Sequence, residues 1–210
     1  MKVFLSLVMM AFLISNFGCR KTQKIIKVFS EEGVLLEQYE VNKDSLRHGT
    51  YIGFYESGDT FEIAQYTHGK LDGQRRIYHE NNQLEILENY VQDSLHGGYK
   101  TYYVSGKLKR QMNFEENEIV GKIKVFYENG QLKEEVSMQN NMENGPFIEY
   151  HENGQKAWEG TYQNGENEIG LLVQYAENGD TIRKLQCDER YICRTFYRNE
   201  NYPQQEESEE

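Results

Sequence analysis

The 210-residue sequence is poor in several residue types, and each shortage excludes a class of protein. It contains only 2 Pro, 3 Cys and 1 Trp. The three cysteines include no Cys-x-x-Cys pair of the kind typical of zinc sites. No apolar run reaches the roughly 20 residues of a membrane-spanning helix. Lys plus Arg is 23 against 34 Asp plus Glu, and this net charge of −11 argues against a general nucleic-acid binder.

Glycine and tyrosine are abundant instead, and the glycines recur at a fixed interval. There are 18 Gly and 16 Tyr. Five glycines are spaced 24 residues apart and a sixth follows after 25: Gly49, Gly73, Gly97, Gly121, Gly145 and Gly170. Nine residues beyond each glycine lies a turn such as Glu128-Asn129-Gly130, and an earlier partial copy contains Glu31-Glu32-Gly33. This spacing is typical of a repeat protein whose units stack on one another.

Each unit predicts two short β-strands joined by a tight turn. Asn-Gly between strand-like runs favours a two-residue hairpin turn in which both residues take positive φ. Asn82 replaces Gly in one copy and tolerates the same conformation. A single hairpin is marginally stable, so the units must pair side by side. We therefore predict an all-β fold, an elongated single-sheet antiparallel meander of stacked 24-residue hairpins over residues 25–198, including a C-terminal capping segment. About 14 strands at ~4.8 Å would span roughly 60–70 Å.

The pattern resembles the MORN repeat, in the bacterial variant form written Tyr-x-x-Asn-Gly-x-Leu-Lys. The best match is Phe126-Tyr127-Glu128-Asn129-Gly130-Gln131-Leu132-Lys133, and the resemblance extends over residues 25 to about 187. It implies the sheet of hairpins predicted above. For function it implies a non-catalytic repeat, and many chains of this family carry an antitoxin label. Trp158 is the single tryptophan, so the lipid-binding roles proposed for the eukaryotic form carry over weakly.

The first nineteen residues resemble a bacterial lipoprotein signal. Lys2 precedes an apolar run from Val3 to Ile14, which is too short to span a membrane as a mature helix and which leads to Gly18-Cys19. The resemblance implies a signal peptide over residues 1–18, lipidation of Cys19 and a linker over residues 19–24. The predicted location is the bacterial cell envelope, as a lipoprotein anchored in the outer membrane. An ordinary secretory signal is the alternative.

Alternation along the strands divides each unit into two faces. With a two-residue turn, one face takes positions 2, 4, 6, 11, 13, 15 and 17 after the repeat glycine. This face is hydrophobic at 26 of 42 positions, against 15 of 42 on the other, so we expect it to be the covered face. The polar face carries an aromatic column at position 5: Phe54, Tyr78, Tyr102, Phe126, Tyr150 and Tyr175.

A group of lysines accompanies this column in the third and fourth units: Lys100, Lys107, Lys109, Lys122, Lys124 and Lys133, with Glu135 expected opposite Lys124. The candidate partner-binding residues are Tyr78, Tyr102, Phe126, Tyr150, Lys107, Lys109, Lys122 and Lys124. Aromatic side chains anchor many protein interfaces, and lysines would suit an acidic partner surface. The alternatives are an aromatic packing ladder, and a solvated sheet face whose lysines oppose aggregation. A glycan or lipid headgroup is a further alternative ligand.

The histidines do not predict a metal site or an active site. His79 and His151 share a repeat position but lie three units apart, which is ~30 Å. His48 and His96 occupy equivalent loops two units apart. His96 is close to Asp93 and Ser94 in sequence, but a catalytic triad needs side chains that converge in a shaped site. We predict no enzymatic activity, no cofactor and no metal.

The C-terminal region predicts a cap and a tail. Cys187 and Cys193 either form a disulfide, which an exported compartment permits, or remain two buried thiols. Residues 199–210 are acidic and predict a disordered tail. Taken together, the sequence predicts a lipid-anchored protein-binding platform whose partner is another protein and not a nucleic acid. The alternatives are an antitoxin or immunity-type protein, a structural spacer and a glycan-binding surface protein; the oligomeric state is left open.

Overall fold

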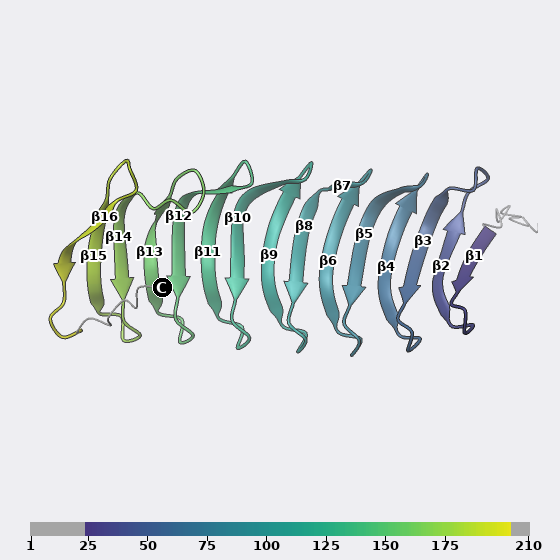
Figure 1. Cartoon of the computed structure of the whole chain (residues 1–210), viewed down its shortest axis with the longest axis horizontal. Helices are drawn as coiled ribbons and strands as arrows, with labels where there is room; N and C mark the ends of the chain where they lie inside the picture. Colours follow the sequence, from purple (N-terminus) through teal and green to yellow (C-terminus); the bar gives the residue numbers. More distant parts are fainter. Residues whose placement is uncertain (1–23, 203–210) are drawn as a thin grey trace, which may run out of the picture.

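The computed structural model describes residues 24–202, which form one continuous antiparallel sheet (Figure 1). The predicted signal region, Cys19 and residues 203–210 lie outside the described residues. The sheet order follows the chain from β1 to β16, and only the two-residue β7 lies beside this path, paired with β6. The predicted all-β single-sheet meander is confirmed. The described residues include no helix with the length and apolar character to cross a membrane.

The first half of the sheet consists of β1 Lys24–Phe29, β2 Leu35–Val41, β3 Arg47–Phe54, β4 Thr60–Thr67, β5 Lys70–Tyr78, β6 Leu84–Val91, β7 Ser94–Leu95 and β8 Gly97–Tyr102. The second half consists of β9 Leu108–Glu115, β10 Glu118–Phe126, β11 Leu132–Gln139, β12 Met142–Tyr150, β13 Lys156–Tyr162, β14 Gly170–Tyr175, β15 Thr181–Cys187 and β16 Cys193–Arg198. Because each strand pairs with its neighbours in the chain, the units line up along one axis.

The turn inside each hairpin differs from the predicted two-residue turn. In the β10–β11 hairpin the Tyr127 N–H donates to the Gln131 carbonyl and the Gly130 N–H donates to the Tyr127 carbonyl, each at 2.9 Å. The loop therefore has three residues, and only its last, Gly130, takes positive φ (93°). This is a type I turn followed by a left-handed residue. Asn82 occupies that left-handed position in its own unit, with φ 63°.

The turns with two positive φ angles lie at the other end of the strands, where one unit joins the next. They occupy positions 19 and 20 after the repeat glycine, as in Glu116-Asn117 (φ 50° and 70°) and Asn140-Asn141 (φ 53° and 59°). The prediction that the Asn-Gly pairs form turns with two positive φ angles was wrong, because such turns lie between the units and not inside each hairpin. The sequence did not reveal these turns, because three of the ten residues there are not Asn, Asp or Gly: His68, Gln92 and Glu116.

The repeat glycines owe their spacing to a bulge. Each takes positive φ, from 74° at Gly170 to 124° at Gly73, where an L side chain is strained. Next to each, the pairing with the preceding unit slips; between β4 and β5, for example, Ala64 pairs with Arg75 and Tyr66 pairs with Leu71. One glycine per 24 residues is therefore needed to bend the strand where it enters the next unit.

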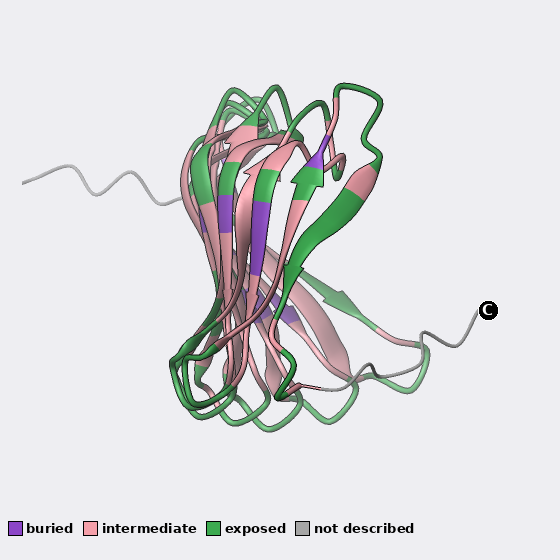
Figure 2. Cartoon of the chain, turned by 90° about the vertical axis from the view of Figure 1, so that its left-hand side faces the viewer, coloured by how far each residue is buried: buried purple, intermediate pink, exposed green. Residues whose placement is uncertain are grey.

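One face of the sheet is covered by its own curvature. Cross-strand partners place positions 2, 4, 13 and 15 on one side, which we call the inner face; Ile123–Val136 and Phe147–Gly160 are two such pairs. Eight of the eleven buried side chains occupy these positions, and the core cluster consists of Val136, Phe147, Leu172 and Cys187. Buried residues lie in the middle of the strands while the turns are exposed (Figure 2). Since residues 24–202 supply no second layer over this sheet, their inner-face side chains bury one another as the sheet curls.

A second bulge exchanges two predicted positions. Phe126 pairs with Leu132 but Val125 pairs with Glu134, so Lys133 is an extra residue, and the same slip occurs in every unit. Position 11 therefore lies beside the position-5 aromatic residue on the outer face, and position 12 turns to the inner face. The prediction had these two positions reversed, because it assumed a two-residue turn and unbroken alternation.

The C-terminal end is closed by a disulfide between Cys187 on β15 and Cys193 on β16. Beyond β16, Asn199 and Tyr202 form a turn that the sequence assigned to the disordered tail. The Asn199 N–H donates to the Ile182 carbonyl at 2.8 Å, and the Tyr202 hydroxyl contacts Asp180 Oδ2 at 3.0 Å. The chain is therefore ordered at least to Tyr202. The two outermost strands, β1 and β16, leave their outer edges unpaired.

Candidate binding surface

A ladder of hydrogen bonds joins each unit to the next along the rim of hairpin turns. The side chain at position 6 reaches the backbone carbonyl at position 5 of the following unit. Tyr55 Oη bonds to Tyr78 O at 2.6 Å, Tyr103 Oη to Phe126 O at 2.7 Å, Tyr127 Oη to Tyr150 O at 2.7 Å and His151 Nε2 to Tyr175 O at 2.9 Å. Beside it, Asn129 Nδ2 donates to the Glu152 carbonyl at 3.1 Å. The sequence pattern shows the recurring side chains at position 6, but it did not predict that they bond to the next unit.

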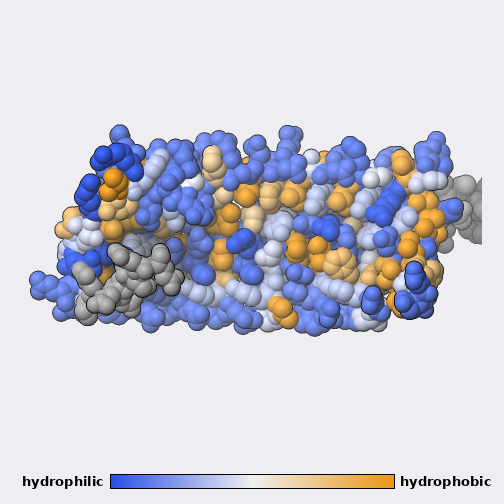
Figure 3. All heavy atoms as spheres, viewed as in Figure 1, coloured by the Kyte–Doolittle hydropathy of each residue, from blue (hydrophilic) through white to orange (hydrophobic). Residues whose placement is uncertain are grey.

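The opposite rim has its own ladder. Asp93 Oδ1 accepts the Leu71 N–H at 2.7 Å, and Asn117 and Asn141 accept the equivalent N–H groups of the preceding turns at 2.8 and 2.6 Å. These polar side chains follow both rims of the molecule, whereas apolar side chains gather along the middle of the face seen in Figure 3. Both ladders fix the distance between units, so they hold any surface that spans several units in a fixed shape.

The inner face of the N-terminal half carries a polar network around two arginines. Arg75 Nε bonds to Glu62 at 2.7 Å and Arg75 Nη1 to Glu88 at 2.9 Å, and both carboxylates are buried. Burial by itself would lower the pKa of Arg75, but the two carboxylates outweigh it and raise that pKa. Arg47 lies over the rings of Tyr39 and Tyr51 at 4.6 and 4.8 Å. Both arginines therefore have a structural role, because their guanidinium groups already contact carboxylates or aromatic rings of the same sheet.

The inner face of the C-terminal half is acidic. Glu134 and Glu149 are direct cross-strand partners. Burial and the Glu134 charge raise the pKa of Glu149. Burial, with the charges of Glu143 and Glu149, also raises the pKa of the Tyr162 hydroxyl. The two halves of the inner face therefore differ in charge, although their backbones repeat.

The outer face carries the predicted aromatic column, now joined by leucines. Tyr78 pairs with Leu84, Tyr102 with Leu108 and Phe126 with Leu132, and all six residues are half-buried. Tyr150 continues the column opposite Lys156. At the end of the column, the Tyr175 hydroxyl bonds to Glu159, and burial together with this carboxylate raises the pKa of Tyr175 to about 12. Three successive units thus present a strip of aromatic–leucine pairs, which we call the outer strip.

The predicted lysine group is divided between the two faces. Lys122 and Lys124 lie on the outer face, and both bond to Glu135 at 2.5 and 2.9 Å, as the expected pairing of Glu135 with Lys124 implies. Hydrogen bonds from these two lysines lower the pKa of Glu135. Lys109, by contrast, turns to the inner face and lies 5.6 Å from the Tyr103 ring centroid, while Lys107 is exposed in the hairpin turn. The outer face is therefore less basic than the sequence suggested.

Comparison with protein families matches the MORN repeat variant to four stretches of this chain, residues 71–92, 95–116, 119–140 and 143–164. Each stretch covers one hairpin and its neighbouring strand segments. The chain contains four MORN repeats. MORN repeats are generally protein- or membrane-binding modules, and the repeat is non-enzymatic. The structure extends the same hairpin on both sides of the matched residues, from β1 to β16.

Comparison with curated proteins finds no match. Among solved structures, this chain is similar to "Crystal Structure of TcdB2-TccC3-TEV" at 11% identity and a TM-score of 0.25, covering 79% of this chain and 11% of that one. It is also similar to "Crystal Structure of TcdB2-TccC3-Cdc42" at 9% identity and a TM-score of 0.16, covering 77% of this chain and 12% of that one. This chain thus spans about a tenth of the length of those chains.

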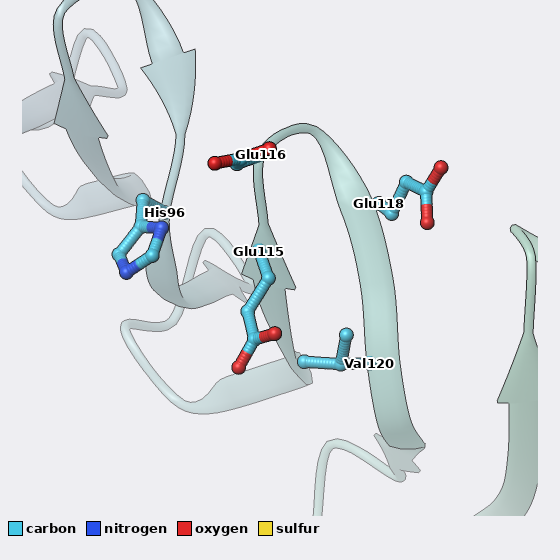
Figure 4. A pocket seen from close by; sticks show the side chains of 5 residues that line it. All are labelled: His96, Glu115, Glu116, Glu118 and Val120. Atoms are coloured by element: carbon cyan, nitrogen blue, oxygen red, sulfur yellow. The ribbon is translucent and has the colours of Figure 1, made fainter.

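The MORN units of this chain bring acidic residues near one histidine, but these side chains are not directed at a common point. A shallow cleft of about 330 Å³ is lined by His96, Glu115, Glu116 and Glu118. Figure 4 shows that the three carboxylates point in different directions, one of them away from the histidine. A general acid–base pair or a metal site requires side chains directed at a common point. This cleft has no such arrangement.

Two further groups concern metal binding. Within residues 24–202, the one set of three potential ligands is Glu168, Cys187 and Cys193, and its cysteines form the disulfide. The rings of His48 and His68, a contact that the sequence did not predict, lie 5.1 Å apart, because the joining turn brings position 19 against the strand that begins the unit. The spacing of 20 residues, close to one unit, was the available signal.

Proposed function

We propose that this chain is a non-catalytic, membrane-anchored platform that binds another protein through the outer strip. The observation that carries the proposal is the run of aromatic–leucine pairs over three units, Tyr78–Leu84, Tyr102–Leu108 and Phe126–Leu132. Half-exposed aromatic side chains supply much of the binding energy in protein interfaces. The two rim ladders keep the pairs in register, so little conformational entropy is lost when a partner binds.

The outer strip can be tested without disturbing the ladders. The ladder uses the backbone carbonyl of Phe126, so alanine substitution removes the ring but keeps that hydrogen bond. We expect the chain from residue 20 to 210 to retain one partner from a cell-envelope extract, and Tyr102→Ala with Phe126→Ala to retain at least tenfold less. Val91→Ala with Leu171→Ala, which trims exposed apolar side chains elsewhere, should retain the partner fully. Undiminished capture by the Tyr102/Phe126 variant, with an unchanged melting temperature, would refute the proposal.

The membrane anchor is the second part of the proposal. It is supported by the Gly18-Cys19 pair after an apolar run, and by strand β1 beginning only five residues later at Lys24. Lipidation of one cysteine can anchor a protein that has no spanning helix. We expect Cys19→Ser to move the full-length protein from the membrane fraction to the soluble fraction. Cys187→Ser with Cys193→Ser should leave it in the membrane fraction. Membrane association of the Cys19→Ser protein would exclude Cys19 as the anchor.

A further inference from the structure

The rim ladder is interrupted at one unit. His79 occupies position 6, where Tyr55, Tyr103, Tyr127 and His151 bond to the next unit. The Nε2 atom of His79 is buried without a hydrogen-bond partner, although the equivalent atom of His151 has one. The Nδ1 atom of His79 faces Glu85 at 3.6 Å. The junction between this unit and the next therefore lacks the position-6 hydrogen bond, although Asn81 Nδ2 still donates to the Val104 carbonyl across it at 3.0 Å.

A cleft of about 350 Å³ opens at this junction, which we call the His79 cleft. The residues that line it include His79, Glu85, Ile86, Thr101, Lys109 and Arg110. Thr101 and Arg110 are cross-strand partners on the inner face, and Lys109 adjoins them over the Tyr103 ring. Lys109 and Arg110 are exposed. Unlike Arg75, neither makes an ion pair within the described part of the chain.

We infer that the His79 cleft binds a carboxylate group presented by a peptide segment. Lys109, Arg110 and the Thr101 hydroxyl supply donors on one wall, and charge-assisted hydrogen bonds from such donors suit a carboxylate. Glu85 on the other wall repels a second anion and accepts hydrogen bonds. A peptide suits both walls. Its acidic side chain accepts hydrogen bonds from the donors on the first wall, and its flanking backbone N–H groups donate to Glu85. The inference rests on the proposed function, since a peptide ligand belongs to a protein partner.

The repeat itself contains a comparison site. Two units further on, a cleft of about 270 Å³ is lined by Tyr127, Lys133, Glu134, Glu149 and Tyr150. Glu149 replaces Thr101 there, and Glu134 replaces Ile86. The two clefts share a backbone and differ in charge, so only the His79 cleft suits an anion. An overall charge of −11 makes this local preference informative, because the rest of the chain repels anions.

The test uses the full chain and a defined probe. A fluorescently labelled peptide Gly-Ser-Glu-Ser-Gly is titrated and followed by anisotropy, with Gly-Ser-Gln-Ser-Gly as the neutral control. We expect the Glu peptide alone to bind, and Arg110→Gln and Lys109→Gln each to weaken it at least tenfold. His79→Tyr should weaken binding by narrowing the cleft, because tyrosine at position 6 bonds to the next unit in three other units and a smaller cleft of about 270 Å³ remains at Tyr127. The matched variant His151→Tyr should bind normally.

Three results would overturn the inference: equal binding of the Glu and Gln peptides, unchanged affinity in Arg110→Gln, or competition by free succinate as strong as by the peptide. Arg110 and Lys109 are exposed, so their variants remain informative even if His79→Tyr does not fold. The test also separates this inference from the proposed function. Undiminished partner capture by the Tyr102/Phe126 variant, together with selective binding of the Glu peptide, would refute the outer strip and leave the His79 cleft standing. Lost capture in that variant, together with equal binding of the Glu and Gln peptides, would do the opposite.

Discussion

Replacing Arg75 by methionine is expected to lower the free energy of unfolding by about 3–5 kcal/mol. Arg75 lies between Glu62 and Glu88, which are 8% and 7% exposed. Removing the guanidinium leaves two carboxylates buried without a cation, and an unpaired buried charge is far more costly than the intact pair is stabilising. Urea denaturation followed by circular dichroism measures the change.

Arg76 provides the matched control for this experiment. It is the next residue of β5, it is exposed, and it pairs with Ile63 and Leu87 on the outer face. Arg76→Met should therefore change the free energy of unfolding by less than about 0.5 kcal/mol. Adding Glu62→Gln and Glu88→Gln to Arg75→Met should restore much of the lost stability, because the buried charges are then gone. A small effect of Arg75→Met alone would show that the carboxylates reach water in the folded protein.

Phe147→Ala is expected to destabilise the protein by about 3–5 kcal/mol, as large-to-small changes of aromatic core residues do. Phe147 is 2% exposed, and its ring stacks on Tyr162 with centroids 4.1 Å apart. It also fills the space over Gly160, where an added Cβ would meet the Phe147 ring at 2.7 Å. In a single sheet, few other side chains can move in to fill the resulting cavity.

The control for Phe147 is its neighbour Ile148, which lies on the outer face opposite Glu135 and Glu159. Ile148→Ala should cost less than half as much, measured by the same urea denaturation. Equal losses from the two variants would mean that both faces are covered to the same extent. That result would contradict the assignment of the core to the inner face.

The repeat and the sheet could be predicted from glycine spacing, because a glycine every 24 residues reflects a backbone requirement that no other residue meets as easily. The turn types could not. Asn-Gly suits both a two-residue turn and the end of a three-residue loop, and only the hydrogen bonds distinguish them. That one-residue difference moved Lys109 and Lys133 to the inner face, next to Tyr103 and Tyr127.

The candidate site was predictable in composition but not in contacts. The sequence identified Tyr102 and Phe126 as a column, and the structure retains them in the outer strip. It did not identify the His79 cleft, because His79 and His151 look equivalent in a repeat alignment. They differ only in whether Nε2 reaches a carbonyl, and this depends on the packing of two neighbouring units.

The rim ladders also bear on how such a chain changes length over evolution. Every ladder bond joins one fixed position of a unit to another fixed position of the adjacent unit, as Tyr103 does to Phe126 and Tyr127 does to Tyr150. Loss of residues 121–144 would bring Tyr103 against Tyr150, an acceptor of the same kind in the same place. Duplication of that stretch would insert one more identical bond. Gene slippage by whole units therefore leaves the fold intact and alters only its reach, by ~10 Å for each hairpin.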